Sequence, residues 1–297
     1  MKMMLSLGWL FIAIVHTAEP LISDNFSNCR DYFYKEQLPQ GFDGNRGINS
    51  LAYICQQYGN TIYFASLYDR DWRIPLYSAY ILDRRNECLG ERKHNFDIEP
   101  QLIELNHNMQ SESEITSEIP KSQAVNADYE KTGYHRGHLN PVCHHETQEG
   151  QDATFTLTNV VPMNSKLNIG KWRVYEANIL KKAEECTTMY VVTGIVPGNN
   201  WLYINRVNIP SYVWNAYCCV GKDSMPIKSG AGIVENYDNK PVNEMKINEL
   251  QEELKKLLMN KGISIFQNNC ELQHKRRRVS RNASSMSGHL QPSPQAP

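Results

Sequence analysis

The first half of the chain alternates apolar and polar positions in a way that predicts paired strands. Residues 61–67 form one strand candidate, a polar turn follows at residues 69–71, and a second candidate covers residues 75–82. In the second candidate both sets of alternating positions are partly apolar, with Tyr77, Ala79 and Ile81 on one face and Ser78, Tyr80 and Leu82 on the other. This pattern is typical of strands that are buried on most of their surface. We therefore expect a meander in the core of the protein.

Helical periodicity occurs twice in the second half of the chain. In residues 168–185 the apolar side chains recur at helical spacing, at Trp172, Tyr175, Ile179 and Ala183. Residues 243–261 carry leucines among glutamates and lysines, and Gly262 supplies a stop signal. Between the two helices, residues 189–196 and 211–220 predict strands. Together these elements predict an α+β fold with a central antiparallel sheet flanked by helices.

The ends of the chain differ from its middle. Residues 1–18 have the layout of a signal peptide, because a lysine at position 2 and an apolar run at residues 5–15 precede small residues at positions 17 and 18. The apolar run is too short to span a bilayer, although a short membrane anchor or a buried helix is an alternative. Residues 271–297 are basic and rich in Ser and Pro, which predicts a disordered tail. We expect one folded domain at residues 19–270 in a secreted, extracellular protein.

Polar composition also marks a segment inside the domain. Residues 106–127 are rich in serine and glutamate, so we expect a long surface loop there. Long loops in compact domains are often functional. This one leads directly into the first block of candidate chemistry.

Cysteine usage supports export from the cell. The sequence holds eight cysteines, at positions 29, 55, 88, 143, 186, 218, 219 and 270. In a secreted chain this number favours disulfides over free thiols. We expect the neighbours Cys218 and Cys219 to bond to two different partners, because a disulfide between adjacent cysteines strains the intervening peptide.

Bulk charge gives no sign of a nucleic-acid binding surface. The chain has 31 basic and 32 acidic residues, a formal net charge of −1. Any binding of a polyanion must therefore be local. The basic run at residues 275–278, with Arg281, could attract phosphates, but it could equally be a processing site or a solvated tail.

The candidate chemistry is concentrated in two short blocks, residues 134–144 and residues 158–172. Hydrolysis of a phosphodiester needs a base for water, a cation facing the phosphate, and neutralisation of the leaving oxygen. His138 could be the base, since an ordinary histidine pKa near about 6.5 leaves neutral imidazole at physiological pH. Arg136 lies two residues earlier, so on an extended segment it shares a face with His138. Its planar guanidinium is suited to binding phosphate.

Asn168 is the candidate metal ligand in the second block. A neutral amide oxygen leaves most coordination positions to water and substrate, which suits Mg²⁺. Glu176 follows eight residues later, within roughly 80° around a continuous helix, so its carboxylate could bind a water on the metal. The alternative interpretation of Asn168 is an N-cap at the start of the predicted helix.

A zinc cluster is a second interpretation of the first block. Its possible ligands are His135, His138, Cys143, His144 and His145. Their spacing matches none of the usual arrangements of zinc ligands, and a disulfide is the more probable use of a cysteine in an oxidising compartment. Separately, Arg92 and Lys93 could approach the phosphate from another strand, or they could be ordinary surface residues.

The two blocks resemble the DNA/RNA non-specific endonuclease family of the ββα-metal (His-Me finger) class, usually written D-R-G-H, T-N-x-x-P-Q, and N-x-G-x-W with a downstream Glu. The resemblance spans roughly residues 29–236 and is strongest to secreted endonuclease domain-containing 1-like proteins, through residues 67–70, 75–80 and 214–219. It implies a ββα-metal active-site motif and nucleic acid, DNA or RNA, as substrate. The roles it implies are the general base for His138, a phosphate or leaving-group stabiliser for Arg136, the direct Mg²⁺ ligand for Asn168, an outer metal partner for Glu176 and an active-site amide for Asn159.

Two positions depart from the family pattern. His135 stands where the family has Asp, and Met163 stands where it has Gln. An Asp would add negative charge near the metal or hold the base, whereas His135 adds none and repels a cation when protonated. The sequence therefore predicts a Mg²⁺-dependent endonuclease with reduced metal affinity or rate. The alternatives are a nuclease-fold binding or immune-response protein without turnover, and a scaffold whose motifs are only structural.

Overall fold

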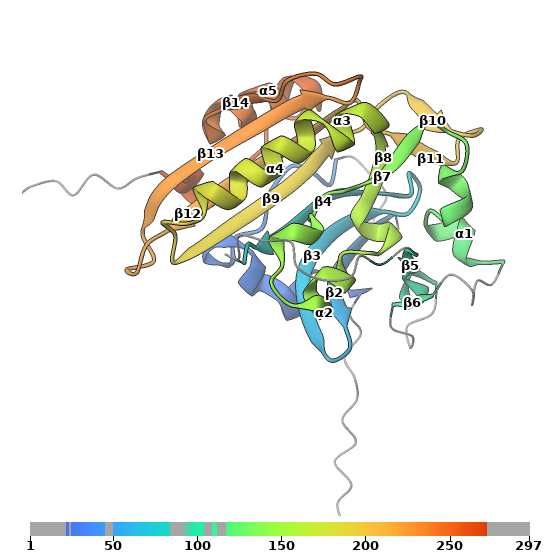
Figure 1. Cartoon of the computed structure of the whole chain (residues 1–297), viewed down its shortest axis with the longest axis horizontal. Coiled ribbons are helices and arrows are strands. Elements are labelled where there is room, and N and C mark those ends of the chain that lie inside the picture. Colours follow the sequence, from blue (N-terminus) through green and yellow to red (C-terminus); the bar gives the residue numbers. More distant parts are fainter. Residues whose placement is uncertain are drawn as a thin grey trace, which may run out of the picture.

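The protein is built around one large antiparallel sheet (Figure 1). A computed structural model describes residues 22–23, 25–44, 50–83, 93, 95–103, 109–111 and 117–271. Eight strands form the sheet in the order β1-β2-β3-β4-β9-β12-β13-β14. The predicted α+β fold with a central antiparallel sheet is therefore confirmed.

The bounds of the elements are as follows. The large sheet contains β1 (Ile22–Ser23), β2 (Leu51–Tyr58), β3 (Thr61–Asp69), β4 (Ile74–Ile81), β9 (Thr188–Val196), β12 (Tyr212–Val220), β13 (Pro226–Glu235) and β14 (Asn243–Met245). Three two-stranded ribbons pair β5 (Asp97–Ile98) with β6 (Gln110–Ser111), β7 (Tyr134–His138) with β8 (Val160–Asn164), and β10 (Asn200–Leu202) with β11 (Val207–Ile209). The α-helices are α1 (Ile119–Ser122), α2 (Gln148–Ala153), α3 (Ser165–Ile169), α4 (Lys171–Lys182) and α5 (Ile247–Leu257).

The expected meander is formed by β2, β3 and β4, which pair antiparallel in chain order. Both predicted strands are present, with β3 running on to Asp69 and β4 beginning at Ile74. Strand β4 is buried along almost its whole length, as its two partly apolar faces predict. Strand β2 was not predicted, because Gln56 and Gln57 interrupt its apolar alternation; Gln56 is nevertheless buried.

The pleat of β12 explains the disulfides of the two adjacent cysteines. Successive side chains of a strand point to opposite faces of the sheet. Cys219 bonds to Cys186, which follows α4, and Cys218 bonds to Cys270, which follows α5. The prediction of two different partners is confirmed, and the two disulfides fasten segments to opposite faces of the sheet. A third disulfide joins Cys29 to Cys55.

Helix α4 packs on the sheet through one apolar stripe. Trp172, Tyr175 and Ile179 are buried at the predicted helical spacing, and burying side chains of this size contributes about 1.5–3 kcal/mol each. The Tyr175 hydroxyl donates to Asn215 Oδ1 on β12 at 3.2 Å. Gly232 on β13 makes room for this ring, because an added Cβ would lie 2.7 Å from it. Figure 1 shows α4 crossing in front of β9 and β12.

Some element boundaries differ from the predictions. Residues 243–261 are not one helix: Asn243–Met245 pairs with β13 as strand β14, and α5 ends at Leu257, where Met259 adopts a positive φ of 50°. The predicted surface loop at 106–127 contains β6 and α1 among its described residues. The expected signal peptide and tail lie outside the described residues, apart from residue 271. Within the described ranges, no helix has the length and apolar character needed to cross a membrane.

Candidate active site

The His-Arg-Gly-His block forms strand β7. It pairs with β8 in a register that places His138 opposite Val160 and His135 opposite Met163. Helix α3 begins directly after β8, so the three elements form a ββα unit. Gly137 is needed for the close approach of the two strands, because a Cβ there would lie 2.5 Å from the Cβ of Met163.

The His138 imidazole is held between two aromatic rings. Its centroid lies 5.3 Å from that of Phe96 and 5.2 Å from that of Phe155, which meets it edge to face. The side chain is only 8% exposed, and its Nε2 atom is buried. The two aromatic rings therefore restrict the orientation of the imidazole.

Arg136 lies on the same face of β7 as His138, as the extended segment predicts. Its guanidinium carbon lies 4.6 Å from the centre of the Phe96 ring, a cation–π contact. One terminal nitrogen donates to Asn126 Oδ1. Phe96 thus orients both the candidate base and the candidate phosphate ligand.

Asn168 does not start the long helix. The backbone breaks at Gly170, with φ −104° and ψ −113°, and this separates α3 from α4. The backbone N–H of Lys171, the residue after Gly170, donates to Asn239 Oδ1 at 2.8 Å. The N-cap interpretation of Asn168 is therefore wrong, because Asn164 caps α3 and Gly170 precedes α4. The predicted angle between Asn168 and Glu176 on one continuous helix is wrong for the same reason.

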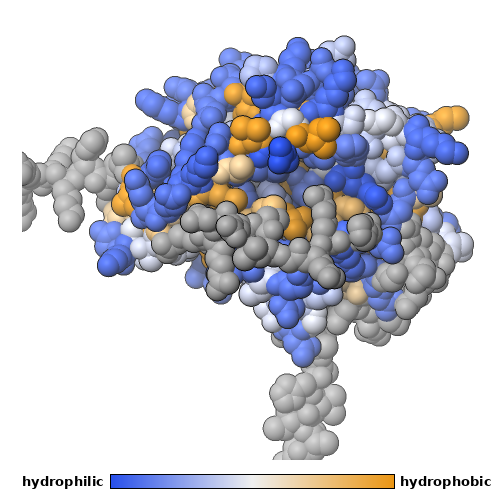
Figure 2. Space-filling view, in the orientation of Figure 1, coloured by the Kyte–Doolittle hydropathy of each residue, from blue (hydrophilic) through white to orange (hydrophobic). Residues whose placement is uncertain are grey.

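A groove nevertheless brings these residues together. Its volume is about 430 Å³, and His138, Asn168 and Glu176 all line it. The rest of its wall comes from residues 141–144 and from one face of α4. In Figure 2, which views this side of the molecule, hydrophobic and hydrophilic surface lie next to each other over α4.

His144 ties the two walls of this groove together. Its ring nitrogens lie 2.9 Å from the Tyr80 hydroxyl and 3.1 Å from the backbone oxygen of Glu176. Because a carbonyl oxygen only accepts, Nε2 carries the proton and Nδ1 accepts from Tyr80. Burial lowers the pKa of His144 to about 4, so the ring stays neutral.

The zinc interpretation has no support from these contacts. The Nε2 of His145 is 3.0 Å from Asn140 Oδ1, burial lowers its pKa to about 3, and Cys143 is disulfide-bonded. Within the described ranges, no three His, Cys, Asp or Glu side chains converge on a possible metal position. Three of the five possible zinc ligands are thus engaged elsewhere.

A hard cation with few protein ligands fits the groove better. The side-chain nitrogen of Asn168 donates to Nδ1 of His135 at 3.3 Å. This contact leaves the amide oxygen of Asn168 able to ligate a cation, while Glu176 adds a carboxylate to the same groove. The donor set is one neutral oxygen and one carboxylate, which matches Mg²⁺ with a largely aqueous shell.

Asn159 is placed beneath the site instead of in the groove. Its side chain is fully buried. The oxygen accepts from the Ser78 hydroxyl at 2.9 Å and from the Asn140 backbone at 3.0 Å, and the nitrogen donates to the backbone oxygens of Asn140 and Thr154, each at 3.0 Å. The oxygen and the nitrogen of this amide both bond within the core. Asn159 therefore fixes the backbone at Asn140, two residues after His138.

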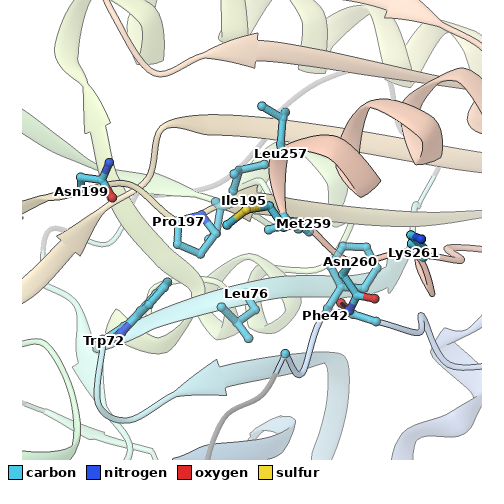
Figure 3. A pocket seen from close by; sticks show the side chains of 14 residues that line it. Phe42, Trp72, Leu76, Ile195, Pro197, Asn199, Leu257, Met259, Asn260 and Lys261 are labelled. Carbon is cyan, nitrogen blue, oxygen red and sulfur yellow. Dashed lines mark hydrogen bonds between the residues drawn. The ribbon is translucent and has the colours of Figure 1, made fainter.

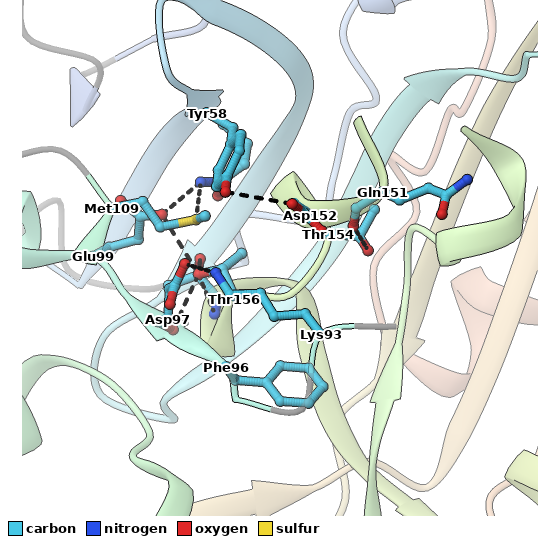
Figure 4. Close-up of polar contacts among 12 residues, drawn as sticks. Tyr58, Lys93, Phe96, Asp97, Glu99, Met109, Gln151, Asp152, Thr154 and Thr156 are labelled. Atoms are coloured by element: carbon cyan, nitrogen blue, oxygen red, sulfur yellow. Dashed lines mark hydrogen bonds and ion pairs between the residues drawn. The ribbon is translucent and has the colours of Figure 1, made fainter. Parts of the chain in front are cut away.

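Of the predicted basic pair, Lys93 is not among the residues that line the groove. Arg92 lies outside the described residues, and Lys93 forms an ion pair with Asp97 and lies 5.6 Å from the centre of the Tyr58 ring (Figure 4). Asp97 thus compensates the charge of Lys93. The same polar cluster contains Glu99, whose Oε1 accepts from Gln56 at 2.6 Å. Burial raises the pKa of Glu99 to about 8.

A larger cavity lies elsewhere in the molecule. Its volume is about 510 Å³, and it is enclosed mainly by apolar side chains such as Phe42, Leu76 and Ile195 (Figure 3). Among the described residues of its lining, Lys261 is the one ionisable side chain. Because these lining residues include no histidine, cysteine or carboxylate, we place the chemistry in the smaller groove.

Sequence reasoning missed the residues that orient the site. Phe96, Phe155 and Asn126 come from three separate segments, and no local pattern marks them. Arg173 also lines the groove. Its helical spacing from Glu176 was visible in the sequence. The sequence did not show the opposite wall of the groove, so Arg173 looked like any other exposed arginine.

Comparisons with known proteins point to one family. The model of the DNA/RNA non-specific endonuclease family matches residues 49–271. The chain is 31% identical over 282 residues to the endonuclease domain-containing 1 protein of Homo sapiens, covering 90% of this chain and 53% of that protein. It is 30% identical over 106 residues to mitochondrial endonuclease G of Homo sapiens, covering 35% of this chain and 34% of that one. The chain thus spans about half the length of the endonuclease domain-containing 1 protein.

A solved structure shares the fold. The crystal structure of an EndoG/EndoGI complex resembles the protein with a TM-score of 0.50 at 19% identity, covering 70% of this chain and 85% of that chain. At this identity the likeness concerns the fold alone. It agrees with a mixed architecture built on a large antiparallel sheet.

Proposed function

Because the chain belongs to the DNA/RNA non-specific endonuclease family, we propose that it is a secreted, Mg²⁺-dependent endonuclease that hydrolyses the phosphodiester bonds of DNA and RNA. The observation that carries this proposal is the groove shared by His138, Asn168 and Glu176. It places an imidazole, an amide oxygen and a carboxylate in the lining of one groove.

His138 is the general base. Its ring lines the groove, which places the imidazole beside the space that a bound water and phosphate would occupy. Phe96 and Phe155 hold the ring still, so the lone pair keeps its direction throughout the reaction. The base takes a proton from the water as it attacks the phosphorus in line.

Arg136 faces the phosphate. The guanidinium stays charged at any physiological pH and offers several N–H donors to phosphate oxygens. Its contacts with Phe96 and Asn126 pre-orient it on the face of β7 that carries His138. It therefore binds the phosphate and stabilises the negative charge that grows during attack.

Asn168 would hold the cation through its amide oxygen, and the carboxylate of Glu176 would bind waters around it. Nucleases of this family depend on a divalent metal. When bound, the cation neutralises the departing 3′ oxygen. His135 fixes the amide of Asn168 so that its oxygen is available. The expected products have 5′-phosphate and 3′-hydroxyl ends, with little sequence preference, because backbone contacts carry no base information.

Cleavage of plasmid DNA and of RNA, with Mg²⁺ and with a chelator, tests this function. We expect cleavage only with the cation, and a loss of at least a hundredfold in His138→Ala and in Asn168→Ala. Asn243→Ala is the matched control, because Asn243 is exposed on β14. Equal activity in all four proteins would exclude the assignment.

A second function is favoured by one contact. His135 replaces the family Asp and touches the metal-binding amide, so the chain could be a nuclease-fold binding or immune-response protein that has lost turnover. That function requires nucleic-acid binding with negligible cleavage at saturating Mg²⁺. High cleavage by the unmodified protein excludes it.

Secretion is a separate part of the proposal. The three disulfides among described residues are consistent with an oxidising compartment. Expression of the full chain in a secretory cell line should deliver the protein to the medium. Retention in the cytosol with reduced cysteines would contradict it.

A further inference from the structure

One face of α4 forms a wall of the groove. Arg173, Glu176, Ala177 and Leu180 follow the spacing i, i+3, i+4, i+7, which places them in one row. The row changes character along the helix, from charged at Arg173 and Glu176 to apolar at Ala177 and Leu180. The groove therefore has a polar end beside Asn168 and an apolar end farther along α4.

The opposite wall is apolar and fixed. Pro141 and Val142 line it, and both are buried. The hydrogen bond from His144 to the backbone of Glu176 links this wall to α4 at 3.1 Å. The width of the groove is therefore set by the fold and does not depend on a ligand.

Arg173 supplies a positive charge at the polar end. Its Nε donates to the backbone oxygen of Ile169 at 3.2 Å, which orients the exposed guanidinium. Lys166 pairs with Asp238 and Lys182 with Glu244, whereas Lys171 and Lys181 lie outside the groove lining and form no ion pair with a described carboxylate. Among the ion pairs formed by described residues, none includes Arg173.

Resting on the proposed function, we propose that this groove is a subsite for one unstacked nucleotide next to the scissile bond. Arg173 binds the neighbouring phosphate, and the apolar end formed by Val142, Ala177 and Leu180 receives the base. A base can enter such a groove only when it is not stacked and paired in a duplex. The subsite therefore makes single-stranded nucleic acid the preferred substrate, with little discrimination among bases.

Binding without cleavage tests the base contact. The probe is a fluorescein-labelled single-stranded dT oligonucleotide, compared in EDTA with a duplex of the same length and with an oligonucleotide whose sugars lack bases. We expect the abasic probe and the duplex to bind about tenfold more weakly. Leu180→Ala should remove most of the difference between the dT and abasic probes, whereas Val174→Ala, an exposed apolar residue of α4 outside the groove, should retain it. Thermal melting checks that Leu180→Ala is folded.

The phosphate contact has its own variant. Arg173→Ala should weaken binding of the dT probe about tenfold at low salt and reduce the salt dependence by about 0.7 in log–log slope, the value for one phosphate on a single strand. Lys171→Ala is the control, because Lys171 is exposed on the same helix outside the groove lining. Arg173→Lys should recover part of the affinity, since it restores the charge without the planar fork.

The two proposals fail in different ways. If the protein cleaves nucleic acid but binds the dT, abasic and duplex probes equally, or if Arg173→Ala and Lys171→Ala behave alike, the subsite is excluded and the nuclease stands. If the protein shows the expected binding pattern but never cleaves with Mg²⁺ or Mn²⁺, the subsite stands and the nuclease is excluded.

Discussion

His135 and Asn168 are joined by a hydrogen bond of 3.3 Å between the imidazole Nδ1 and the side-chain nitrogen of the amide. The residue that departs from the family pattern therefore contacts the proposed metal ligand directly. A neutral imidazole can orient the amide, but it adds no negative charge near the cation. An aspartate at this position could do both.

His135→Asp should therefore strengthen the binding of Mg²⁺. We expect the Mg²⁺ concentration for half-maximal cleavage to fall about tenfold or more, the usual scale for groups that support a metal ligand. The control is His135→Asn, which removes the imidazole without adding charge. If the two variants need the same Mg²⁺ concentration, charge at this position does not govern metal affinity.

Asn159→Ala should destabilise the protein and misplace the end of β7. The side chain bonds both the N–H and the backbone oxygen of Asn140, two residues after His138, so its loss leaves several buried groups unpaired. We expect the free energy of unfolding to fall by about 3 kcal/mol, as measured by urea denaturation. Asn243→Ala, at an exposed position, should cost little. A stable Asn159→Ala protein with normal cleavage would show that this buried amide does not position the site.

Local patterns predicted much of the fold, because strands and helices with one buried face carry their own periodicity. Strands β3, β4, β9 and β12 were placed within a few residues of their bounds. The break at Gly170 was missed because its cause is tertiary: Asn239, far along the chain, accepts the N–H of Lys171. The apolar residues at helical spacing, Trp172 to Ala183, all follow Gly170 and so did not mark the break.

The candidate site was predictable to a similar degree. The short motifs named His138, Asn168 and Glu176, which the structure brings into one groove, whereas Arg136 is not among the residues that line it. The sequence could not show that the amide of Asn159 bonds to Ser78, Asn140 and Thr154, since two of these partners, Ser78 and Asn140, lie in other segments of the chain. The pairing of Lys93 with Asp97 follows an i, i+4 spacing, which was visible in the sequence.

Glu99→Gln should stabilise the protein at alkaline pH. Burial raises the pKa of Glu99 from 4.5 to about 8, so the folded state holds a proton that the unfolded state has released. Its contribution to stability is fully present below pH 4.5 and is lost as the pH rises through 8, at about 1.4 kcal/mol per pH unit. The variant should thus exceed the unmodified protein in urea denaturation at pH 8 and match it near pH 4. Glu252→Gln, on the exposed side of α5, should show no such divergence.

Two buried histidines should make the folded protein less stable at acid pH. Burial lowers the pKa of His144 to about 4 and that of His145 to about 3, the second helped by the charge of the first. Their contributions to stability are present above pH 6.5 and are lost as the pH falls. The reason is that the unfolded state binds protons in this range, whereas the folded state does not. Each histidine adds about 1.4 kcal/mol per pH unit to the slope between pH 6.5 and 4.

Glu99 opposes this loss of stability in acid over part of the same pH range. Its own contribution to the free energy of unfolding grows as the pH falls toward 4.5. We therefore expect the acid limb of a stability–pH profile, followed by tryptophan fluorescence in urea, to be steeper in Glu99→Gln than in the unmodified protein. In the Glu99→Gln protein, a further His144→Gln substitution should reduce the slope of the stability–pH profile by the contribution of one histidine, about 1.4 kcal/mol per pH unit. A flat profile from pH 6.5 to 4.5 in Glu99→Gln would mean that His144 and His145 accept protons in the folded state, against the burial and hydrogen bonds that keep both rings neutral.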